Sequence, residues 1–598
     1  MSAITNPFVD YLTRYTTASP DHEAAFDEFL SQVQPPSGEP LRLETLVEAF
    51  LRMCFTQPNP PSIILTGNAG DGKTYLCRQI ITAFTGHPVD DWEQFAEQPI
   101  ERKGQRLHVI KDLSELGAGR GIAVLRDLAT SLNDGHHDRY LIAANEGRLR
   151  DLLGRGEDAL RTLYTIVDRQ LQHGVESGST QLVVLNLNAV TTSSFVPATL
   201  QWMAHHDHWQ ACGGCPILDR CPIYHNAQRL RDEYIVNRVH ILYQLLEHLD
   251  IHVTMRDMLI HLAYTVTGDQ RCAELQHLEA ERHDLSDYAY YENIWGGTAD
   301  NARRRKGSVV QHLERLCVGN HSLFEIDNFV VSGGDTAEQQ AEHAALFMPA
   351  VDLNYQRFAQ DRRAYVEGGA ELQADEEAAA ILRWLPHSRR KLFFEWRTPA
   401  LTNRLIPFLY LETYLDLLRD EHGSMEQVRR DLVLGLNRAF SRLYLTDSDN
   451  LYVTTQYLHS AEQPRPLVRL TIPASGVDIR IRRSSDRSHD HERLELRLLI
   501  APPPTLMLRP GGAELKPLGW RLNLLTFEYL MRLAYGGTFN ILADECELSL
   551  RALKDRLLSA FAHEQARTDL IEFFVVDRQR YTLKKFQIDA QGTIRSGG

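Results

Sequence analysis

The sequence predicts an α/β domain built on a parallel sheet, followed by a mainly helical region and an α+β C-terminal region. Three observations support this fold class. From residue 62 to residue 187, short apolar runs alternate with helix-like segments, which is the pattern of βαβ units. From about residue 200 to residue 450 the segments are mostly helix-like, and after residue 451 alternating, β-like runs begin. A chain of 598 residues has room for several such domains.

The first part of the chain divides into a helical start and the α/β core. Residues 1–57 are expected to be helical, with the clearest amphipathic helix at residues 41–53. A proline-rich stretch ends that helix, and the core then spans residues 58–200. Its strands are expected at residues 62–66, 106–112, 140–144 and 181–187. Helices are expected between them at residues 73–84, 122–132 and 149–172.

Three further regions are expected after the core. Residues 201–330 form a helical subdomain, residues 331–450 a second helical region, and residues 451–598 an α+β domain. Strands in the last domain are expected at residues 467–472, 477–482 and 494–500. Its two helices, at residues 522–534 and 548–561, precede a hairpin at residues 573–586. Two helices followed by a hairpin indicate a winged-helix-like module.

Composition and charge exclude several classes of protein. The first thirty residues lack the basic start and apolar stretch of a secretory signal, and no run of about 18 apolar residues predicts a transmembrane helix. Eight cysteines are too few for a disulfide scaffold, so we expect a cytoplasmic protein with no membrane contact. The net charge of −15 argues against a nonspecific nucleic-acid coat, although it allows a local basic groove.

The strongest local signal is the motif G-x-x-x-x-G-K-[ST], which lies between the first apolar strand and the next helix. Its residues are Gly67, Asn68, Ala69, Gly70, Asp71, Gly72, Lys73 and Thr74. Glycines let backbone N–H groups point at phosphate oxygens, and the helix N-terminus adds a partial positive charge. Lys73 is expected to reach the β and γ phosphates, and Thr74 to bind Mg²⁺. The motif predicts a P-loop NTPase core, AAA+-like or STAND-like, that binds ATP with Tyr75 beside the nucleotide.

A hydrolytic P-loop enzyme also needs a carboxylate near the magnesium ion and a group that polarises water. Two strand ends offer candidates, because ligands of open α/β sheets bind at the carboxyl ends of the strands. Asp112 and Glu115 follow the second strand, and Asn145 and Glu146 follow the third. Neither strand shows four apolar residues followed by Asp-Glu, and ordinary capping of a strand end would explain either pair.

Two further places could complete the nucleotide site. Asn186 and Asn188 follow the fourth strand and are weaker candidates. Thr254 can cap a helix that begins at Met255, and Arg256 in its first turn could touch the γ phosphate. An ordinary surface or capping role is the alternative for Arg256.

A second local signal is a cluster of potential metal ligands. The run C-x2-C-x5-C-x3-H consists of Cys212, Cys215, Cys221 and His225. Thiolates bind metals well in the cytosol, where a disulfide would not persist. The spacing predicts a structural zinc knuckle with these four ligands. An iron–sulfur cluster is the rival, with Cys272 as the fourth ligand. His205, His206 or His208 could also replace His225.

Two basic segments could contact nucleic-acid phosphates. One is the run of four basic residues at 303–306, and the other consists of Arg480, Arg482, Arg483 and Arg487. Solvated charge is the simpler interpretation of both. The sequence contains no Ser/His/Asp triad or nuclease motif with suitable spacing, so we do not expect the chain itself to cleave nucleic acid.

Several segments together resemble the DptF-like P-loop ATPases of bacterial DNA-phosphorothioation-dependent restriction, and related ATPases of phage-defence operons. The segments are GNAGDGKT (67–74), HVIKDLSEL (108–116), LIAANEGRL (141–149), VVLNLNAV (183–190), CGGCPILDRCPIYHNA (212–227) and HVTMRDMLIHLAYTVTG (252–268). The likeness continues more thinly to about residue 440, through RRKLFFEW (389–396) and GLNRAF (435–440). The resemblance implies an ATPase that works with partner proteins on DNA in antiviral defence.

The leading hypothesis is an ATPase that acts as a motor or sensor in a multi-protein, DNA-directed restriction system. Its expected catalytic residues are Lys73, Asp112, Glu115, Asn145 and Glu146. Expected partners are DNA, a nuclease or helicase of the same system, and a second copy of the chain. The alternative is a nucleotide-gated scaffold that hydrolyses little ATP and recruits a separate nuclease. A kinase-like transferase is a third hypothesis, for which the sequence offers no acceptor-pocket motif.

Overall fold

The computed structural model describes most of the chain. The described residues are 4–17, 34–57, 59–87, 99–102, 104–134, 138–155, 158–173, 181–297, 307–367, 374–419, 425–456, 466–483, 494–503, 515–537, 543–562, 570–577, 580–589, 591 and 593–597. The chain forms two compact units, which are described separately. The first unit comprises residues 1–247, 251–407 and 484–492, and the second comprises residues 248–250, 408–483 and 493–598.

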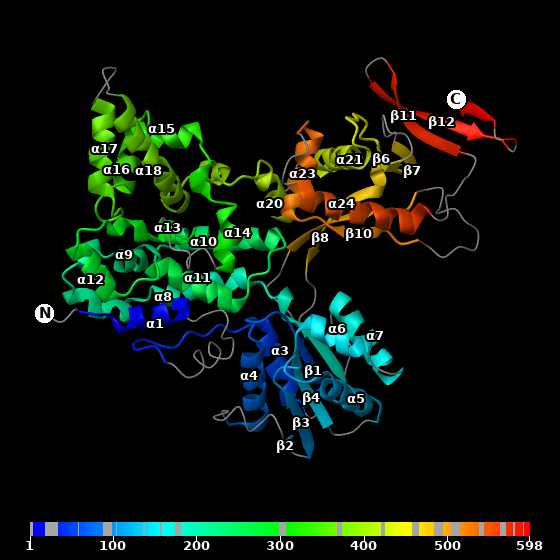
Figure 1. The fold of residues 1–598 in the computed structure, drawn as a ribbon, viewed down its shortest axis with the longest axis horizontal. Coiled ribbons are helices and arrows are strands. Elements are labelled where there is room, and N and C mark those ends of the chain that lie inside the picture. The colour runs from blue at the N-terminus through cyan, green and yellow to red at the C-terminus, as the bar shows by residue number, and fades with distance from the viewer. Residues whose placement is uncertain are drawn as a thin grey trace. The chain divides into compact units, whose positions relative to one another are not determined.

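The first unit contains a five-stranded sheet in the order β2-β3-β4-β1-β5 (Figure 1). The strands are β1 (Ser62–Thr66), β2 (Ile100–Arg102), β3 (Gln105–Ile110), β4 (Asp138–Ala144) and β5 (Leu182–Asn186). β3, β4, β1 and β5 are parallel, whereas β2 pairs antiparallel with β3. All five side chains of β1 are buried, because a central parallel strand is covered on both faces. The predicted parallel sheet is therefore confirmed, with β2 added at one edge.

Helices cover both faces of this sheet. They are α3 (Leu46–Thr56), α4 (Lys73–Thr85), α5 (Ala118–Asp134), α6 (Glu146–Gly154) and α7 (Asp158–His173). Ile63 and Leu65 of β1 pack in one core with α3 and α4, and Ile64 packs in the other with α5, α6 and α7. Successive side chains of β1 enter opposite cores because side chains alternate along a strand.

Three sequence-based boundaries in this part of the chain were wrong. The helix expected at residues 41–53 begins at Leu46, because the Thr45 hydroxyl accepts a hydrogen bond from the Glu48 N–H and caps it there. The single helix expected at residues 149–172 is the pair α6 and α7. The strand expected at residues 106–112 ends at Ile110. Apolar spacing identifies such elements but does not locate their ends.

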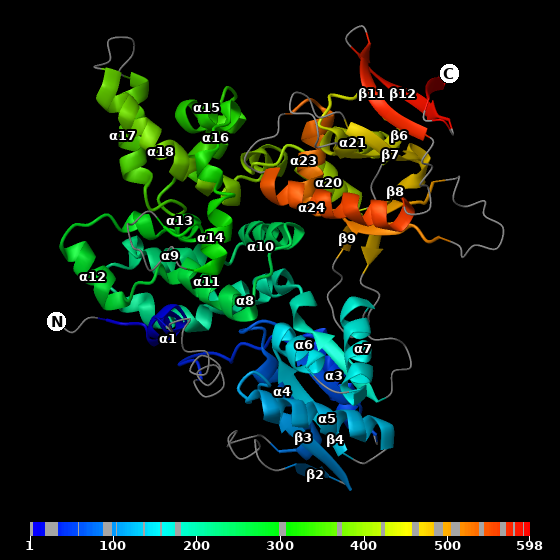
Figure 2. The same cartoon turned by 45° about the vertical axis from the view of Figure 1, so that its right-hand side comes forward.

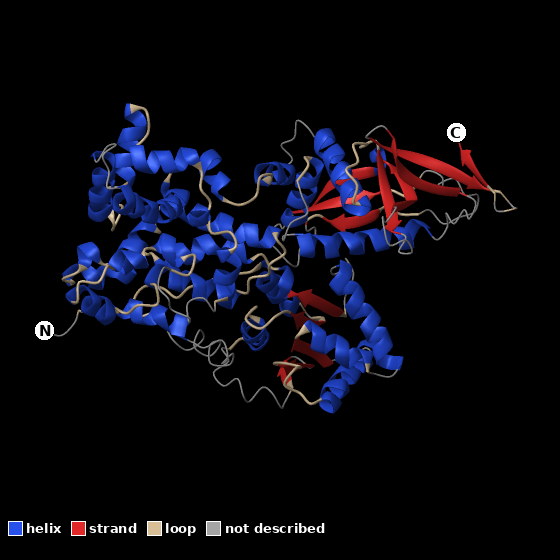
Figure 3. Ribbon diagram, turned by 45° about the horizontal axis from the view of Figure 1, so that its top comes forward, coloured by secondary structure: helices blue, strands red, loops and turns tan. Residues whose placement is uncertain are grey.

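The remainder of the first unit is mainly helical, as predicted, and Figure 3 shows it almost free of strands. Its helices are α1 (Pro7–Thr17), α8 (Val196–Met203), α9 (Pro222–Arg229), α10 (Glu233–His248), α11 (Met255–Thr267), α12 (Cys272–Ala280), α13 (Tyr290–Asn293), α14 (Ser308–Glu314), α15 (Phe324–Ser332), α16 (Ala337–Leu346), α17 (Tyr355–Glu367), α18 (Ala374–Glu395) and α19 (Pro399–Thr402). The N-terminal helix α1 packs against α11. The N-terminal segment is therefore part of this helical region.

The second unit is the α+β domain predicted for the C-terminal part of the chain (Figure 2). Its helices are α20 (Leu411–Arg419), α21 (Met425–Ser441), α23 (Leu524–Ala534) and α24 (Ala543–Leu557). Its strands are β6 (Asn450–Gln456), β7 (Pro466–Pro473), β8 (Val477–Arg483), β9 (Leu494–Ile500), β10 (Leu518–Arg521), β11 (Leu570–Asp577), β12 (Arg580–Ile588) and β13 (Ile594–Gly597). They form two antiparallel sheets, β10-β9-β8 and β13-β12-β11-β7-β6.

Two features of the second unit differ from the sequence-based expectation. The hairpin of β11 and β12 is the centre of a five-stranded sheet, whereas the wing of a winged helix would stand alone. Apart from residues 248–250, the unit begins at residue 408 and so includes α20 and α21, which lie before the boundary placed at residue 450. Gly435 of α21 explains the close packing of α21 on α23, because a Cβ there would collide with the Leu530 carbonyl.

In the described part of the chain, no helix is long and apolar enough to cross a membrane.

Candidate functional site

The loop from Gly67 to Gly72 joins the end of β1 to the start of α4. Gly70 and Gly72 have φ values of 91° and 84°, which side chains other than glycine rarely allow. Gly72 is also the N-cap of α4, so the first N–H groups of that helix face the loop. The predicted motif therefore occupies the strand–loop–helix position in which a loop can cradle phosphate.

The side chains of Lys73 and Asp71 both make hydrogen bonds to the backbone of the loop. Lys73 Nζ donates to the Gly67 carbonyl at 3.0 Å and the Asn68 carbonyl at 2.6 Å. Asp71, with a side chain only 3% exposed, accepts the Asn68 N–H through Oδ2 at 2.6 Å. Its Oδ1 lies 2.8 Å from Nε2 of His252, a residue of the helical region. One carboxylate thus connects the loop to the segment before α11.

The start of α11 lies directly on the same loop. Thr254 caps the helix by accepting the Asp257 N–H, as the sequence predicted, and the Arg256 N–H donates to the Gly70 carbonyl at 3.2 Å. A Cβ built on Gly70 would lie 3.0 Å from both Arg256 Cβ and Thr254 Oγ1. The structure therefore places Arg256 beside the loop although it follows the sheet by many residues.

A cavity of about 470 Å³ opens next to the loop, a size typical of small-molecule sites. Residues of several separate segments line it, among them Tyr11 and Tyr15 of α1, Leu41 and Leu43 before α3, Gly70 to Leu76 without Lys73, Leu187 and Val190 after β5, and Met255, Arg256 and Leu259 of α11. Burial and the neighbouring Glu48 carboxylate raise the pKa of the Tyr75 hydroxyl, so this phenol stays protonated at neutral pH. The cavity combines apolar walls with an edge formed by Gly70, Asp71 and Gly72 of the loop.

The strand ends place the candidate polar residues at one edge of the sheet. Thr66 is level with both Ala144 and Asn186, and Ile110 is level with Ile142. Asn145 therefore follows the strand next to β1, and Asp112 follows the strand after that, about 10 Å from β1. Beyond β5, Asn188 Oδ1 accepts the Asn68 N–H at 3.1 Å and so contacts the loop directly.

The other strand-end side chains bond locally. Asp112 Oδ1 accepts the Ser114 N–H at 2.7 Å, and Glu115 is exposed. Asn145 caps α6 by accepting the Gly147 N–H at 3.0 Å. Asn186 likewise caps the short 3₁₀ turn that follows β5. The local hydrogen bonds agree with the alternative interpretation, in which these residues cap the strand ends. The side chains nevertheless remain at the carboxyl edge of the sheet, where a nucleotide could reach them.

Glu146 is committed to an ion pair. Arg150 Nε lies 3.0 Å from Glu146 Oε1, and the same guanidinium also contacts Asp168. This pair lies on the α6–α7 side of the strand end. Asp112, by contrast, accepts a backbone N–H and has no ion pair with any described residue.

The predicted metal ligands separate into two groups. Cys212, Cys215, Cys221 and Cys272 line one cavity, which we call the four-thiol cavity. His225 is not among its lining residues. The charged side chains near His225 are instead Lys391, Glu395 and Arg229, and burial lowers its pKa to about 4. The sequence run C-x3-H thus does not bring its histidine to the cysteines, because α9 carries the His225 ring toward α18.

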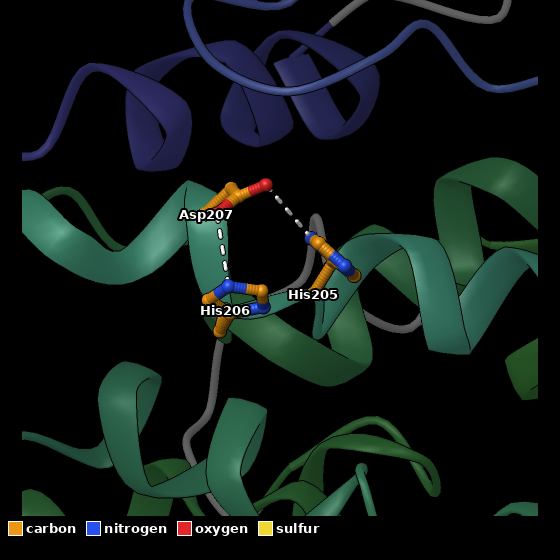
Figure 4. A group of neighbouring side chains, drawn as sticks. All are labelled: His205, His206 and Asp207. Atoms are coloured by element: carbon orange, nitrogen blue, oxygen red, sulfur yellow. Dashed lines mark ion pairs between the residues drawn. The ribbon is translucent and has the colours of Figure 1, made fainter.

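The neighbouring histidines do not line the four-thiol cavity either. His208 is buried and stacks on Phe8 with ring centroids 3.8 Å apart. His205 and His206 form an exposed group with Asp207, whose carboxylate oxygens lie 3.5 Å and 3.0 Å from the two rings (Figure 4). Such a surface group of consecutive residues is adequately explained by solvated charge.

Of the two basic segments, the structure describes the side chains of Arg480 and Arg482 alone. Residues 303–306 and Arg487 lie outside the described residues, as does the side chain of Arg483. Arg480 and Arg482 are exposed on β8, and Arg480 pairs with Asp478 at 2.6 Å.

Sequence reasoning missed His252 and the aromatic lining from α1. No local pattern could have identified them, because each meets the loop or cavity only through the tertiary fold. Comparisons with protein-family models, with curated proteins and with solved structures gave no match. The functional argument therefore depends on the geometry of the site.

Proposed function

We propose that the protein binds Mg·ATP at the loop of residues 67–74 and hydrolyses it. The observation that carries this proposal is the position of Lys73: its ammonium group lies inside a glycine loop that joins a buried parallel strand to a helix N-terminus. A cation and converging N–H groups at that position are complementary to the β and γ phosphates. The adjoining 470 Å³ cavity offers room for the nucleoside.

The remaining residues have distinct roles in this proposal. Thr74, which follows Lys73 and lines the cavity, supplies its hydroxyl to Mg²⁺. Asp112 holds the magnesium-bound water, and Asn145, which directly follows the intervening strand β4, orients the attacking water. Arg256 approaches the γ phosphate from the helical region, so loss of that phosphate changes what holds α11 against the loop.

The biological setting follows from the resemblance to DptF-like ATPases. It supports an ATPase that acts as motor or sensor with DNA and a partner nuclease or helicase in antiviral restriction. The second candidate, a gated scaffold with little turnover, is favoured by one observation: Glu146, a possible water-polarising carboxylate, is paired with Arg150.

Turnover separates the two candidates. ATP hydrolysis by the full-length protein is measured with and without duplex DNA, and nucleotide affinity is measured with a fluorescent ATP analogue. We expect Lys73→Ala to lower turnover on the order of 100-fold, because it removes a charge aimed at the transferring phosphoryl group. Lys584→Ala, on an exposed position of β12, is the matched control and should keep wild-type turnover.

Each result decides between the proposals. DNA-stimulated turnover that disappears in Lys73→Ala supports the motor or sensor. Tight, Lys73-dependent binding with background phosphate release supports the scaffold. No nucleotide binding by the wild type would refute both.

A further inference from the structure

The four-thiol cavity collects cysteines from separated parts of the chain. Cys212 and Cys215 belong to the 3₁₀ turn of residues 206–214 and its C-cap, Cys221 precedes α9, and Cys272 is the first residue of α12. Figures 1 and 2 show α9, α12 and α1 next to one another. Most of the remaining walls are apolar: Ile4, Val9, Trp209, Ile217, Leu218, Ile223 and Leu275. Four soft ligands thus converge in a largely apolar site, with Cys212 buried and the other three cysteines partly buried.

Three of the sulfur atoms accept hydrogen bonds from amide groups. Asn6, which is 3% exposed, donates Nδ2 to Cys212 Sγ at 3.3 Å and its backbone N–H to Cys272 Sγ at 3.4 Å. Gln276 Nε2 lies 3.8 Å from Cys215 Sγ. N–H donors stabilise sulfur in its anionic, metal-binding form and tune the clusters that such sulfurs hold. A buried asparagine serving two cysteines is an arrangement that packing alone does not require.

The spacing of the sulfur atoms distinguishes one ion from a larger group. Four thiolates at a Zn–S distance of about 2.3 Å would lie about 3.8 Å from one another. No three of these four sulfur atoms, all within the described residues, lie within 4.8 Å of one another. In a [4Fe–4S] cube each thiolate binds a different iron atom, so the sulfurs stand roughly 6 Å apart.

We propose that the four thiols of this cavity bind one [4Fe–4S] cluster. The ligand set replaces His225 of the zinc knuckle by Cys272, so the fourth ligand comes from α12. All four cysteines are free of disulfides, as cluster ligation requires. Through Asn6, the cluster fixes the segment before α1 to α9 and α12. This proposal is independent of the nucleotide site, and neither depends on the other being correct.

The test begins with metal content. The full-length protein, purified without oxygen, should be brown and contain about four iron and about four acid-labile sulfide per chain. Reduction with dithionite should give the electron paramagnetic resonance signal of a reduced [4Fe–4S] cluster. Cys272→Ser and Cys221→Ser should each lose most of the iron. His225→Gln and Cys546→Ser should retain it, because His225 and Cys546 lie outside the cavity.

The contrast between Cys272→Ser and His225→Gln is decisive because the zinc knuckle and the cluster use different fourth ligands. One zinc and no iron per chain, even after anaerobic reconstitution with ferrous iron and sulfide, would overturn the proposal. Full iron content in Cys272→Ser would also overturn it. Where a variant does not fold, the iron, sulfide and resonance spectrum of the wild-type protein still decide the question.

Discussion

Asp112 and Glu146 both follow strands at the carboxyl edge, but their carboxylates have different neighbours. The Ser114 N–H binds one oxygen of Asp112, whereas Glu146 is paired with the Arg150 guanidinium. A carboxylate held by a full positive charge is a poor partner for a magnesium-bound water. We therefore expect Asp112→Asn to lower kcat on the order of 100-fold and Glu146→Gln to lower it less than about threefold.

We would measure steady-state ATP hydrolysis and nucleotide affinity for both variants. The measurement tests whether Asp112→Asn lowers kcat more than Glu146→Gln does. Affinity should change little in either variant, since neither side chain is part of the loop. The reverse order, with Glu146→Gln the more damaging, would place the water-polarising group at the end of β4 and contradict the role given to Asp112.

At the scale of elements, local signals were predictable, whereas most tertiary contacts, with Arg256 beside the loop as an exception, were not. The strands around the loop are short apolar runs, and each could be recognised from its own residues. The contact between Asp71 and His252 joins positions in different regions, so no spacing rule finds it. The cysteines show the same limit: a short spacing pointed to His225, whereas the fold brings Cys272 to the other three cysteines.

Helix α11 carries a buried histidine, His261, that makes the free energy of unfolding of the protein depend on pH. His261 Nε2 donates to the Ile294 carbonyl at 3.0 Å, which leaves Nδ1 to accept the Tyr243 hydroxyl at 2.7 Å. Burial lowers the pKa of His261 to about 4, although Asp257 acts in the opposite direction. Because the unfolded chain takes up the proton near pH 6.5, stability is full above that pH. It falls between pH 6.5 and pH 4, by about 3 kcal/mol at most.

Urea unfolding at a series of pH values between 7 and 4 measures this loss. His261→Gln should be less stable at neutral pH but should lose less stability on acidification, because the group that titrates is gone. Other buried histidines, such as His343, remain in both proteins and cancel in the difference. If the free energy of unfolding fell with pH by the same amount in wild type and in His261→Gln, His261 would not titrate in this range.

At the scale of the whole molecule, the two compact units predict two unfolding transitions. The loop of residues 67–74, the cavity of about 470 Å³ beside it and the four-thiol cavity all belong to the first unit. Mg·ATP should therefore stabilise only the transition of that unit, by about 2.7 kcal/mol at a ligand concentration of 100 Kd. Scanning calorimetry of the full-length protein, with and without Mg·ATP, measures both transitions in one experiment.

Two variants assign the transitions. Leu530 is fully buried in α23, so Leu530→Ala should lower the transition of the second unit by about 2–5 kcal/mol and leave the other in place. Lys73→Ala should abolish the shift caused by Mg·ATP without moving the second transition. If Mg·ATP raises both transitions equally, the units unfold as one cooperative body, and the binding energy reaches the C-terminal unit. If it raises only the transition that Leu530→Ala lowers, the nucleotide binds in the second unit and the site at Lys73 is wrong.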